Sequence, residues 1–545
     1  MKNPYWSNHA IYQIYPRSFC DSNGDGIGDI PGIISKLDYL QRLGIHIVWL
    51  SPLYRSPNDD FGYDISDYEA INPEYGTMED MERLIAEAKK RDISLVMDLV
   101  VNHTSDEHPW FLASKDKNSP YHDYYYWREG KNGKAPNNWT SVFPGSAWEY
   151  VPEVGQYYLH IYGKKQPDLN WHNPKVLEEV EKILRFWLDK GIYGFRCDVI
   201  NQIWKDSLGN GKGHSPSGRG MEHYLSRPGD HDILKKLRSD VFEHYDCIVI
   251  GETVNVDYPN GRKFLDQELD MFFQFDTTGV GKPATPLYFP HFSSQKFMEK
   301  IYGWQKEVAW NANYLENHDQ PRSINRFGDP AHHWKESGKM LALLNFTLRG
   351  TPFVYEGEEL GMLNYPRMEE PKDYQDVSAK NTYQILKKYR IFSEKRIRRF
   401  VDVYNRDHER CPFPWDSSKN AGFSSSDKPW LPIEANVSFL NAESEEKDPD
   451  SIYAFYQKLI ALRLEDQTLA LGSIEPLPLP DPLYAYRRIF EGHSEMILFN
   501  FSSQEKALPK DFSLEGTLRL ATYSDTSLKG KRTLRAYEGL LLQEK

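Results

Sequence analysis

The feature that most constrains the fold of this chain is a recurring pattern of short apolar runs separated by segments with helical periodicity. Eight such runs, rich in β-branched and aromatic residues, span 10–16, 45–51, 94–101, 194–199, 247–252, 270–275, 310–317 and 351–356. An intervening helix is clearest at 173–191, where Pro174 suits the first helical position and Gly191 ends the apolar stripe. Eight alternating β/α units predict an α/β fold, a (β/α)8 TIM barrel whose site lies at the C-terminal ends of its strands.

Two long connections and a change of pattern divide the chain further. We expect residues 1–102 to form the first part of the barrel and 103–171 an inserted domain after strand 3, because that aromatic, polar stretch is too long for a simple loop. The second part of the barrel should span 172–466, with an excursion at about 361–448 whose Pro-, Ser- and Asp-rich parts predict irregular structure. Short alternating runs over 467–545 predict a C-terminal antiparallel β-sandwich.

Composition excludes several classes of function. The net charge of −13 argues against non-specific binding to nucleic acid. No run of about 18 apolar residues is present, and the N-terminal stretch has no apolar signal region, so neither a membrane partner nor secretion is expected. Four cysteines in 545 residues match neither a metal site nor a disulfide framework. We therefore expect a cytoplasmic protein, and a monomer.

Charged residues stand where apolar strands should end. Arg196 and Asp198 interrupt the run 194–199, and because strand side chains alternate, both point to one face. Glu252 ends the fifth run, and Asp319 follows the seventh. One such carboxylate alone would most simply be a salt bridge or a cap. Several at the same end of different barrel strands indicate an active site.

The arrangement favours glycoside hydrolysis over other chemistries. The chain has no nucleophilic serine elbow, no phosphate-binding glycine loop and no zinc spacing. A retaining glycosidase needs one ionised carboxylate as nucleophile and one protonated carboxylic acid. We expect Arg196 to keep Asp198 charged, and burial at the end of an apolar strand to raise the pKa of Glu252.

Five motifs then make the chain similar to a known family. They are DLVVNH (98–103), QPDLNW (166–171), GFRCDVIN (194–201), GETV (251–254) and ENHDQPR (316–322). In this order, over nearly the whole chain, they resemble the alpha-amylase superfamily of retaining glycoside hydrolases, in its oligo-1,6-glucosidase-like branch. The resemblance implies that Asp198 is the nucleophile, Glu252 the acid/base and Asp319 a third carboxylate that binds sugar hydroxyls.

The same resemblance implies a closed sugar pocket. Its expected members stack on the terminal glucose, exchange hydrogen bonds with it, wall the pocket or flank the nucleophile, and they are Tyr63, Asp64, His103, Phe143, Tyr162, Gln166, Arg196, Val199, His318 and Arg410. One stretch departs from the family: after Arg410 relatives usually carry Thr-Pro-Met-Gln-Trp, whereas this chain has Cys-Pro-Phe-Pro-Trp. That difference falls on the leaving-group side of the pocket.

A second motif, DSNGDGIGD at 21–29, predicts a structural Ca²⁺ site. Oxygen ligands would come from Asp21, Asn23, Asp25, the carbonyl of Ile27, and Asp29, at loop positions 1, 3, 5, 7 and 9. The twelfth position is Gly32 and not Glu, so the loop is not a true EF-hand. A bare Asp/Gly turn is the alternative.

These observations predict an exo-acting retaining α-glucosidase that hydrolyses α-1,6 bonds at the non-reducing end of isomaltose and short isomalto-oligosaccharides. In this branch Val at the position of Val199, next to the nucleophile, goes with α-1,6 cleavage, and Thr or Ala with α-1,4 cleavage. The alternatives are a trehalose-6-phosphate hydrolase and a sucrose isomerase or glucosyltransferase of the same superfamily. A non-catalytic transporter subunit is a further alternative, but it would need a membrane anchor and lost carboxylates.

Overall fold

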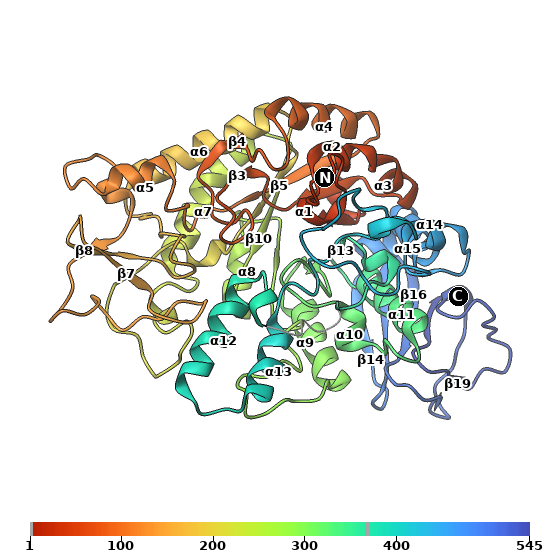
Figure 1. Cartoon of the computed structure of the whole chain (residues 1–545). Helices are drawn as coiled ribbons and strands as arrows, with labels where there is room; N and C mark the ends of the chain where they lie inside the picture. Colours follow the sequence, from red (N-terminus) through yellow and green to blue (C-terminus); the bar gives the residue numbers. More distant parts are fainter. Residues whose placement is uncertain (1–3, 366–370, 545) are drawn as a thin grey trace.

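A computed structural model describes residues 4–365 and 371–544, and it contains the expected (β/α)8 barrel (Figure 1). Eight parallel strands form one sheet in the order β11-β10-β9-β5-β2-β1-β13-β12, and its end strands β11 and β12 contact each other, so the barrel is nearly closed. The strands are β1 (Ile11–Ile14), β2 (Ile47–Leu50), β5 (Ser94–Leu99), β9 (Gly194–Cys197), β10 (Ile248–Glu252), β11 (Met271–Phe273), β12 (Ala312–Asn313) and β13 (Thr351–Tyr355). The predicted fold class is confirmed.

Helices surround this barrel, as binary patterning predicts. The main ones are α2 (Ile30–Ser35), α3 (Leu37–Leu43), α4 (Met78–Lys90), α6 (Pro174–Asp189), α7 (Pro228–Asp240), α8 (Tyr258–Phe264), α9 (Ser294–Glu307), α11 (Trp334–Thr347) and α15 (Ile452–Glu465). Asn173 caps α6 by accepting from the backbone N–H of Lys175. Strand side chains alternate between the outer core, which includes Val249, and an inner core, which includes Ile248 and Ile250.

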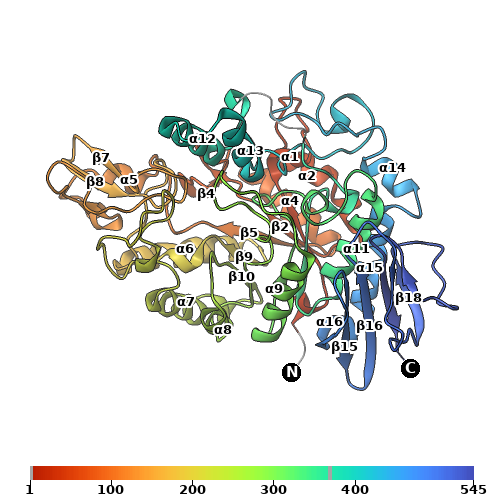
Figure 2. The ribbon, with the colours of Figure 1, turned by 90° about the horizontal axis from the view of Figure 1, so that it is seen from below.

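Two segments extend the barrel at the ends of its strands. Between β5 and α6 lie α5 (Pro109–Ser114) and a small antiparallel sheet of β6 (Trp127–Arg128), β8 (Gln156–Leu159) and β7 (Trp148–Val151). A hairpin of β3 (Tyr54–Arg55) and β4 (Asp67–Ile71) holds the loop 56–66. Figure 2 shows the sheet of β7 and β8 extending away from the barrel.

The excursion after β13 is more regular than its composition suggests. It contains an antiparallel hairpin of α12 (Val377–Tyr389) and α13 (Glu394–Tyr404), whose facing sides bury Tyr383, Ile397 and Val401. Irregular structure follows from 405 to 441, broken by a 3-10 turn at Lys419–Gly422, and then α14 (Ala442–Lys447). Proline, serine and aspartate are concentrated in this later part, which explains why composition concealed the two helices.

The C-terminal part is an antiparallel β-domain. Its five-stranded sheet has the order β14 (Ser473–Leu477), β15 (Leu483–Phe490), β16 (His493–Asn500), β20 (Gly539–Gln543), β18 (Thr517–Ala521), and a two-stranded sheet joins β17 (Lys506–Ala507) to β19 (Thr533–Leu534). Over the described residues no helix is both long enough and apolar enough to cross a lipid bilayer.

Candidate active site

Arg196, which interrupts the apolar pattern of strand β9, is at the centre of a cluster of buried charged side chains. The residue is fully buried, and one guanidinium nitrogen lies 2.6 Å from Asp98 and 2.7 Å from Asp198. The other terminal nitrogen lies 2.6 Å from Glu252. Asp98 is directly opposite Arg196 in the parallel pairing of β5 and β9. A buried strand therefore carries an arginine because three neighbouring carboxylates need one cation.

Asp198 and Glu252 form a coupled buried pair. Burial raises the pKa of Glu252, although Arg196 opposes the shift, and this direction agrees with our prediction. Burial raises the pKa of Asp198 as well, also against Arg196, with the negative charge of Glu252 adding to the rise. We expected Arg196 to keep Asp198 charged, but the guanidinium is shared among three carboxylates and does not outweigh the burial that raises the pKa of Asp198. The pair therefore holds a proton at a pH where two free carboxyl groups would both be ionised.

Val199 has an unusual backbone at this site. Its φ of 37° and ψ of 39° place a β-branched residue in the left-handed region, which is a strained conformation. Its N–H donates to Glu252 Oε2 at 3.2 Å. The backbone of the residue after Asp198 thus orients the carboxyl group of Glu252, and its side chain lines the pocket.

Asp319, the third carboxylate of the pocket lining, is held ionised. Arg410 donates to its Oδ1 at 2.8 Å and Arg406 at 3.1 Å, while Nε2 of His318 lies 3.3 Å from Oδ2. Burial alone would raise the pKa of Asp319, but His318 and the two guanidinium groups hold it well below its usual range. Burial lowers the pKa of His318 to about 3, so the imidazole is charged only at low pH, and at neutral pH the two arginines supply the positive charge.

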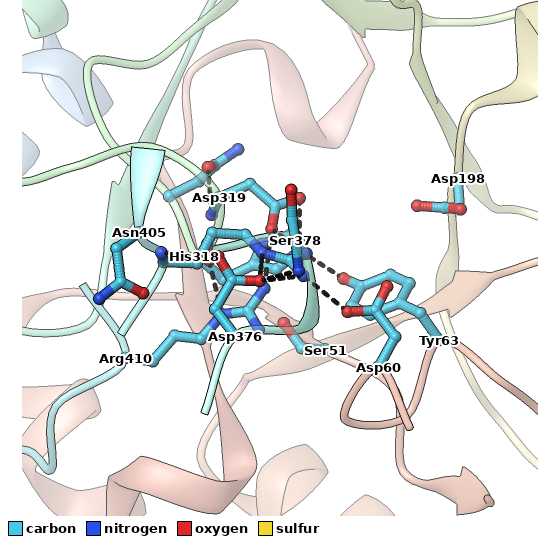
Figure 3. A network of polar contacts seen from close by, with 12 residues as sticks. Ser51, Asp60, Tyr63, Asp198, His318, Asp319, Asp376, Ser378, Asn405 and Arg410 are labelled. Carbon is cyan, nitrogen blue, oxygen red and sulfur yellow. Dashed lines mark hydrogen bonds and ion pairs between the residues drawn. The ribbon is translucent and has the colours of Figure 1, made fainter. Parts of the chain in front are cut away.

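Figure 3 shows this network, with Asp198 standing apart from it. Arg406 also donates to Asp60 at 2.7 Å and to Asp376 at 2.7 and 2.9 Å. Asp376 is buried and is the N-cap of α12, so the helical excursion is anchored at the pocket. Neither Asp60, Asp376 nor Arg406 was expected here. The only signal in the sequence was a second arginine four residues before Arg410.

The expectation for Asp64 is corrected by this geometry. Asp64 is fully buried and accepts hydrogen bonds from the backbone N–H groups of Asp59 and Asp60 and from Ser56, so it stabilises the turn of loop 56–66 and does not line the pocket. Asp60, four residues earlier, lines it instead.

The expectation for Arg410 is corrected in the same way. Arg410 is fully buried and contacts Asp319, while Arg406 is the arginine that lines the cavity.

The pocket between these groups has a volume of about 200 Å³. Its wall combines carboxylates, aromatic rings and a few polar groups. The lining residues are Asp60, Tyr63, His103, Val142, Phe143, Tyr162, Gln166, Asp198, Val199, Glu252, Val254, Phe275, Asp319, Ser378 and Arg406. The structure thus gathers most of the predicted residues around one cavity, while Arg196, His318 and Arg410 lie directly behind its wall.

Aromatic and amide groups give the pocket its shape. The ring of Tyr63 is stacked on that of His318, with centroids 5.3 Å apart and planes at 5°. Phe143 meets Tyr162 edge to face at 5.5 Å. Burial lowers the pKa of His103 to about 4, so this side chain is a neutral hydrogen-bonding group next to Gln166. Flat rings and neutral donors are suited to a sugar, whose faces are apolar and whose edges carry hydroxyls.

A lysine joins the inserted segment to the barrel beneath this wall. Lys205, fully buried, lies 2.6 Å from Asp168 and donates at 2.9 Å to Asn102 and to the carbonyl of Gln202. Gln202 in turn accepts from the hydroxyl of Tyr162. Sequence reasoning overlooked Lys205 because an isolated lysine after a strand gives no sign of burial.

The loop 21–29 is closed by its own hydrogen bonds. Asp21 accepts from the N–H groups of Asn23, Gly24 and Gly26, and Asp25 accepts from Ile27. Asp29 accepts from Gly32 and caps α2. Within residues 4–365 and 371–544, no three His, Cys, Asp or Glu side chains converge in a metal-binding arrangement.

These features define a class. A (β/α)8 barrel with two coupled carboxyl groups and a third ionised carboxylate around a sugar-sized pocket is the architecture of a glycoside hydrolase. Residues 13–472 match the catalytic domain of alpha-amylase, so the chain belongs to the alpha-amylase family and is an enzyme of its glycoside hydrolase type. The resemblance inferred from the five motifs is confirmed.

Several members of that family with named activities are similar to this chain over nearly its whole length. It is 46% identical over 520 residues to an oligo-1,6-glucosidase of Parageobacillus thermoglucosidasius, covering 92% of each chain. Among solved structures it is similar to a trehalulose synthase, with 40% identity, a TM-score of 0.94 and coverage of 99% and 100%. It is also similar to the trehalose-6-phosphate hydrolase of Bacillus licheniformis, with 40% identity, a TM-score of 0.93 and full coverage of both chains.

Proposed function

We propose that this enzyme is an exo-acting retaining α-glucosidase that hydrolyses the α-1,6 bond at the non-reducing end of isomaltose and short isomalto-oligosaccharides. The observation that carries the proposal is the buried pair Asp198 and Glu252, both held by Arg196, in a pocket that Asp60, Arg406 and Asp319 also line. The relatives named oligo-1,6-glucosidases support the choice of linkage.

The chemistry follows from that geometry in two steps. In the productive state the shared proton is on Glu252, and the Asp198 carboxylate attacks the anomeric carbon. The bond from that carbon to the glycosidic oxygen breaks, and Glu252 gives its proton to the departing oxygen. A water then attacks the anomeric carbon, Glu252 takes up its proton, and the bond to Asp198 breaks. Two inversions leave the α-anomer of glucose as the first product.

Exo action follows from the closed end of the pocket. Arg406 joins Asp60 and Asp319 in the pocket lining, and we expect these ion pairs to close one end of the pocket to a passing glucan chain. Only a terminal glucose can enter, and its hydroxyls can exchange hydrogen bonds with these charged groups. Charge-assisted hydrogen bonds of this kind favour a single orientation of the sugar.

The charges around the pocket argue against the main alternative function, a trehalose-6-phosphate hydrolase. A trehalose-6-phosphate hydrolase needs cationic groups for the phosphate on the leaving sugar. Among the described lining residues Arg406 is the only cation, and it is paired with carboxylates. Lys164 and Lys165 pair with acidic residues of the inserted segment, Glu149 and Glu107. These pairings favour an uncharged leaving sugar.

Val199 sets the expected preference for linkage. An α-1,6 bond has an additional rotatable methylene, which lets the leaving sugar turn away from a β-branched side chain. A misfit of one or two methyl groups is worth about 1–3 kcal/mol, or roughly 10–200-fold in kcat/KM. We expect isomaltose to be cleaved at least tenfold faster than maltose, and Val199→Ala to raise activity on maltose more than it lowers activity on isomaltose.

A rate panel with isomaltose, maltose, sucrose, trehalose and trehalose 6-phosphate tests both the function and this prediction. Val199→Thr is measured beside Val199→Ala, because it keeps the branched shape at the same strained backbone position and so separates the effect of shape from that of the apolar methyl group. Equal wild-type rates on maltose and isomaltose would refute the role of Val199. A preference for trehalose 6-phosphate would establish the alternative hydrolase, and conversion of sucrose to an isomer would establish the isomerase.

We propose in addition that loop 21–29 binds a structural Ca²⁺. The donor set supports this, since Asp21, Asn23, Asp25, Asp29 and the carbonyl of Ile27 offer only hard oxygens. The hydrogen bonds from loop N–H groups hold Asp21 and Asp25 in turns, and exposed Asn23 and Asp25 would have to rotate to join the ion. Ca²⁺ would stabilise the loop and take no part in catalysis.

Calcium is therefore expected to raise the melting temperature. An ion that binds the folded state at 100 times its Kd adds about 2.7 kcal/mol to the free energy of unfolding. Calorimetry with 1 mM Ca²⁺ and with a chelator measures the effect. Asp25→Asn should reduce it, while Asp38→Asn, at an exposed position of α3, should not. A melting temperature that is equal with Ca²⁺ and with chelator would establish the bare turn.

Finally, we propose a cytoplasmic monomer. Its four cysteines are all free, which is typical of a reducing compartment. Cell fractionation and light scattering test the two statements.

A further inference from the structure

The hairpin of α12 and α13 carries a concentration of positive charge that catalysis does not use. Between 387 and 399 the chain has seven Lys or Arg residues and one Glu, although its net charge is −13. Within the part of the chain that the structure describes, that acid, Glu394, lies 3.1 Å from Arg398. Five of the cations, Lys387, Lys388, Arg390, Lys395 and Arg396, are exposed around the turn between the helices. Figure 1 shows this hairpin at the edge of the molecule.

Two large apolar side chains stand among these cations. Ile391 is 71% exposed and Tyr389 is 61% exposed, and they flank Arg390 in the turn. The hairpin does not need them for its own core, because Tyr383, Ile397 and Val401 fill the space between the helices. An exposed aliphatic residue next to an exposed tyrosine, surrounded by lysine and arginine, is the composition of a segment that lies in a membrane interface.

We propose that this tip, residues 387–396, docks the enzyme on a lipid surface that contains anionic headgroups. The cations contact the headgroups, while Tyr389 and Ile391 enter the boundary between headgroups and acyl chains. The negative charge on the rest of the molecule does not prevent this contact, since charges more than about 8 Å away are screened at physiological salt. Sequence analysis expected no membrane partner because no apolar run spans a bilayer, but a peripheral contact needs none.

Lipid is favoured over nucleic acid by the shape and chemistry of the tip. Binding to single-stranded nucleic acid uses a basic groove with aromatic platforms on which bases stack. Here one of the two exposed apolar groups is aliphatic, and both occur at a turn between helices. The tip is also separate from the residues that line the pocket, where the hairpin contributes only Ser378. Docking is therefore compatible with turnover of a small soluble sugar.

Sedimentation of the full-length protein with vesicles tests the proposal. Vesicles of phosphatidylcholine alone are compared with vesicles containing one quarter phosphatidylglycerol, at 0.1 M salt. We expect at least tenfold stronger partitioning onto the anionic vesicles. The variant Lys387→Glu/Lys388→Glu/Lys395→Glu/Arg396→Glu should lose that gain. The matched control reverses four exposed lysines elsewhere, Lys131, Lys134, Lys510 and Lys529, and should retain it.

Two further measurements complete the test. The double variant Tyr389→Ser/Ile391→Ser should bind anionic vesicles at least threefold more weakly at 0.3 M salt, where headgroup attraction is screened. Both tip variants should hydrolyse isomaltose within twofold of the wild type, which shows that they are folded. Equal vesicle binding by the tip and control variants would overturn the proposal. Tip-dependent binding to RNA without binding to anionic vesicles would overturn it in favour of a nucleic-acid partner.

Discussion

Asp198→Asn and Glu252→Gln are each expected to abolish most of the activity on isomaltose while the protein stays folded. Loss of the acid/base should lower kcat by roughly 10²–10⁴-fold. Loss of the nucleophile should cost on the order of 10⁴–10⁶-fold, as it does in enzymes with a covalent intermediate. Both substitutions are nearly isosteric, and each removes one of three carboxylates around Arg196, so repulsion inside the pair decreases. Steady-state rates and melting temperatures measure the two effects.

The two variants should differ in one respect. An aryl glucoside has a good leaving group and needs little protonation, so Glu252→Gln should retain much more activity on it than Asp198→Asn does. The exposed substitutions Asp232→Asn and Glu243→Gln are the controls and should leave both rates unchanged. NMR should detect α-glucose as the first product. Detection of β-glucose, or wild-type rates in either variant, would contradict the assignment.

The pH dependence follows from the same pair. Burial raises the pKa of Glu252, so the acid form persists at higher pH than for a free glutamic acid, and kcat/KM should fall as pH rises through that pKa. On the acid side, activity should fall as Asp198 becomes protonated. The profile should therefore be bell-shaped, and Glu252→Gln should flatten its alkaline limb for the aryl glucoside.

Arg406→Met should have the second largest effect, a fall in kcat/KM for isomaltose of about 10²–10³-fold. The guanidinium contacts Asp60, Asp319 and Asp376, and removal of one partner from a buried ion pair costs about 3–5 kcal/mol. Without Arg406 the pKa of Asp319 should rise, and the end of the pocket that receives the sugar should open. Initial rates at several substrate concentrations separate the effects on KM and kcat.

A second substitution distinguishes lost function from lost stability. Arg406→Met leaves Asp376 buried without its cation, so the variant should melt at lower temperature. Arg406→Met/Asp376→Asn removes that charge and should recover part of the stability without recovering activity. Arg399→Met, on the exposed side of α13, should change neither quantity. A reduction of less than threefold for Arg406→Met would show that the closed end of the pocket is not needed.

The local sequence was sufficient to predict the barrel, because the spacing of apolar residues in each segment shows whether that segment forms a strand or a helix. Alternation alone placed Arg196, in β9, and Asp198, one residue past its end, on one side, and the order of the runs placed Glu252 at the end of β10. Burial of Glu252 followed from its position after an apolar strand. These inferences need only neighbours in the chain, which is why they agree with the structure.

Contacts between distant segments could not be determined in this way. Arg406 meets Asp60 across 346 residues, and in loop 56–66 the sequence did not distinguish Asp60, which lines the pocket, from Asp64, which holds the turn. The backbone of Val199 is left-handed although valine resists that conformation, because its N–H is bound to Glu252 on another strand. Lys205 and Asp168 likewise meet only after the inserted segment folds onto the barrel. Tertiary structure decided these positions, because the energy of a buried charge depends on the partners that surround it in space.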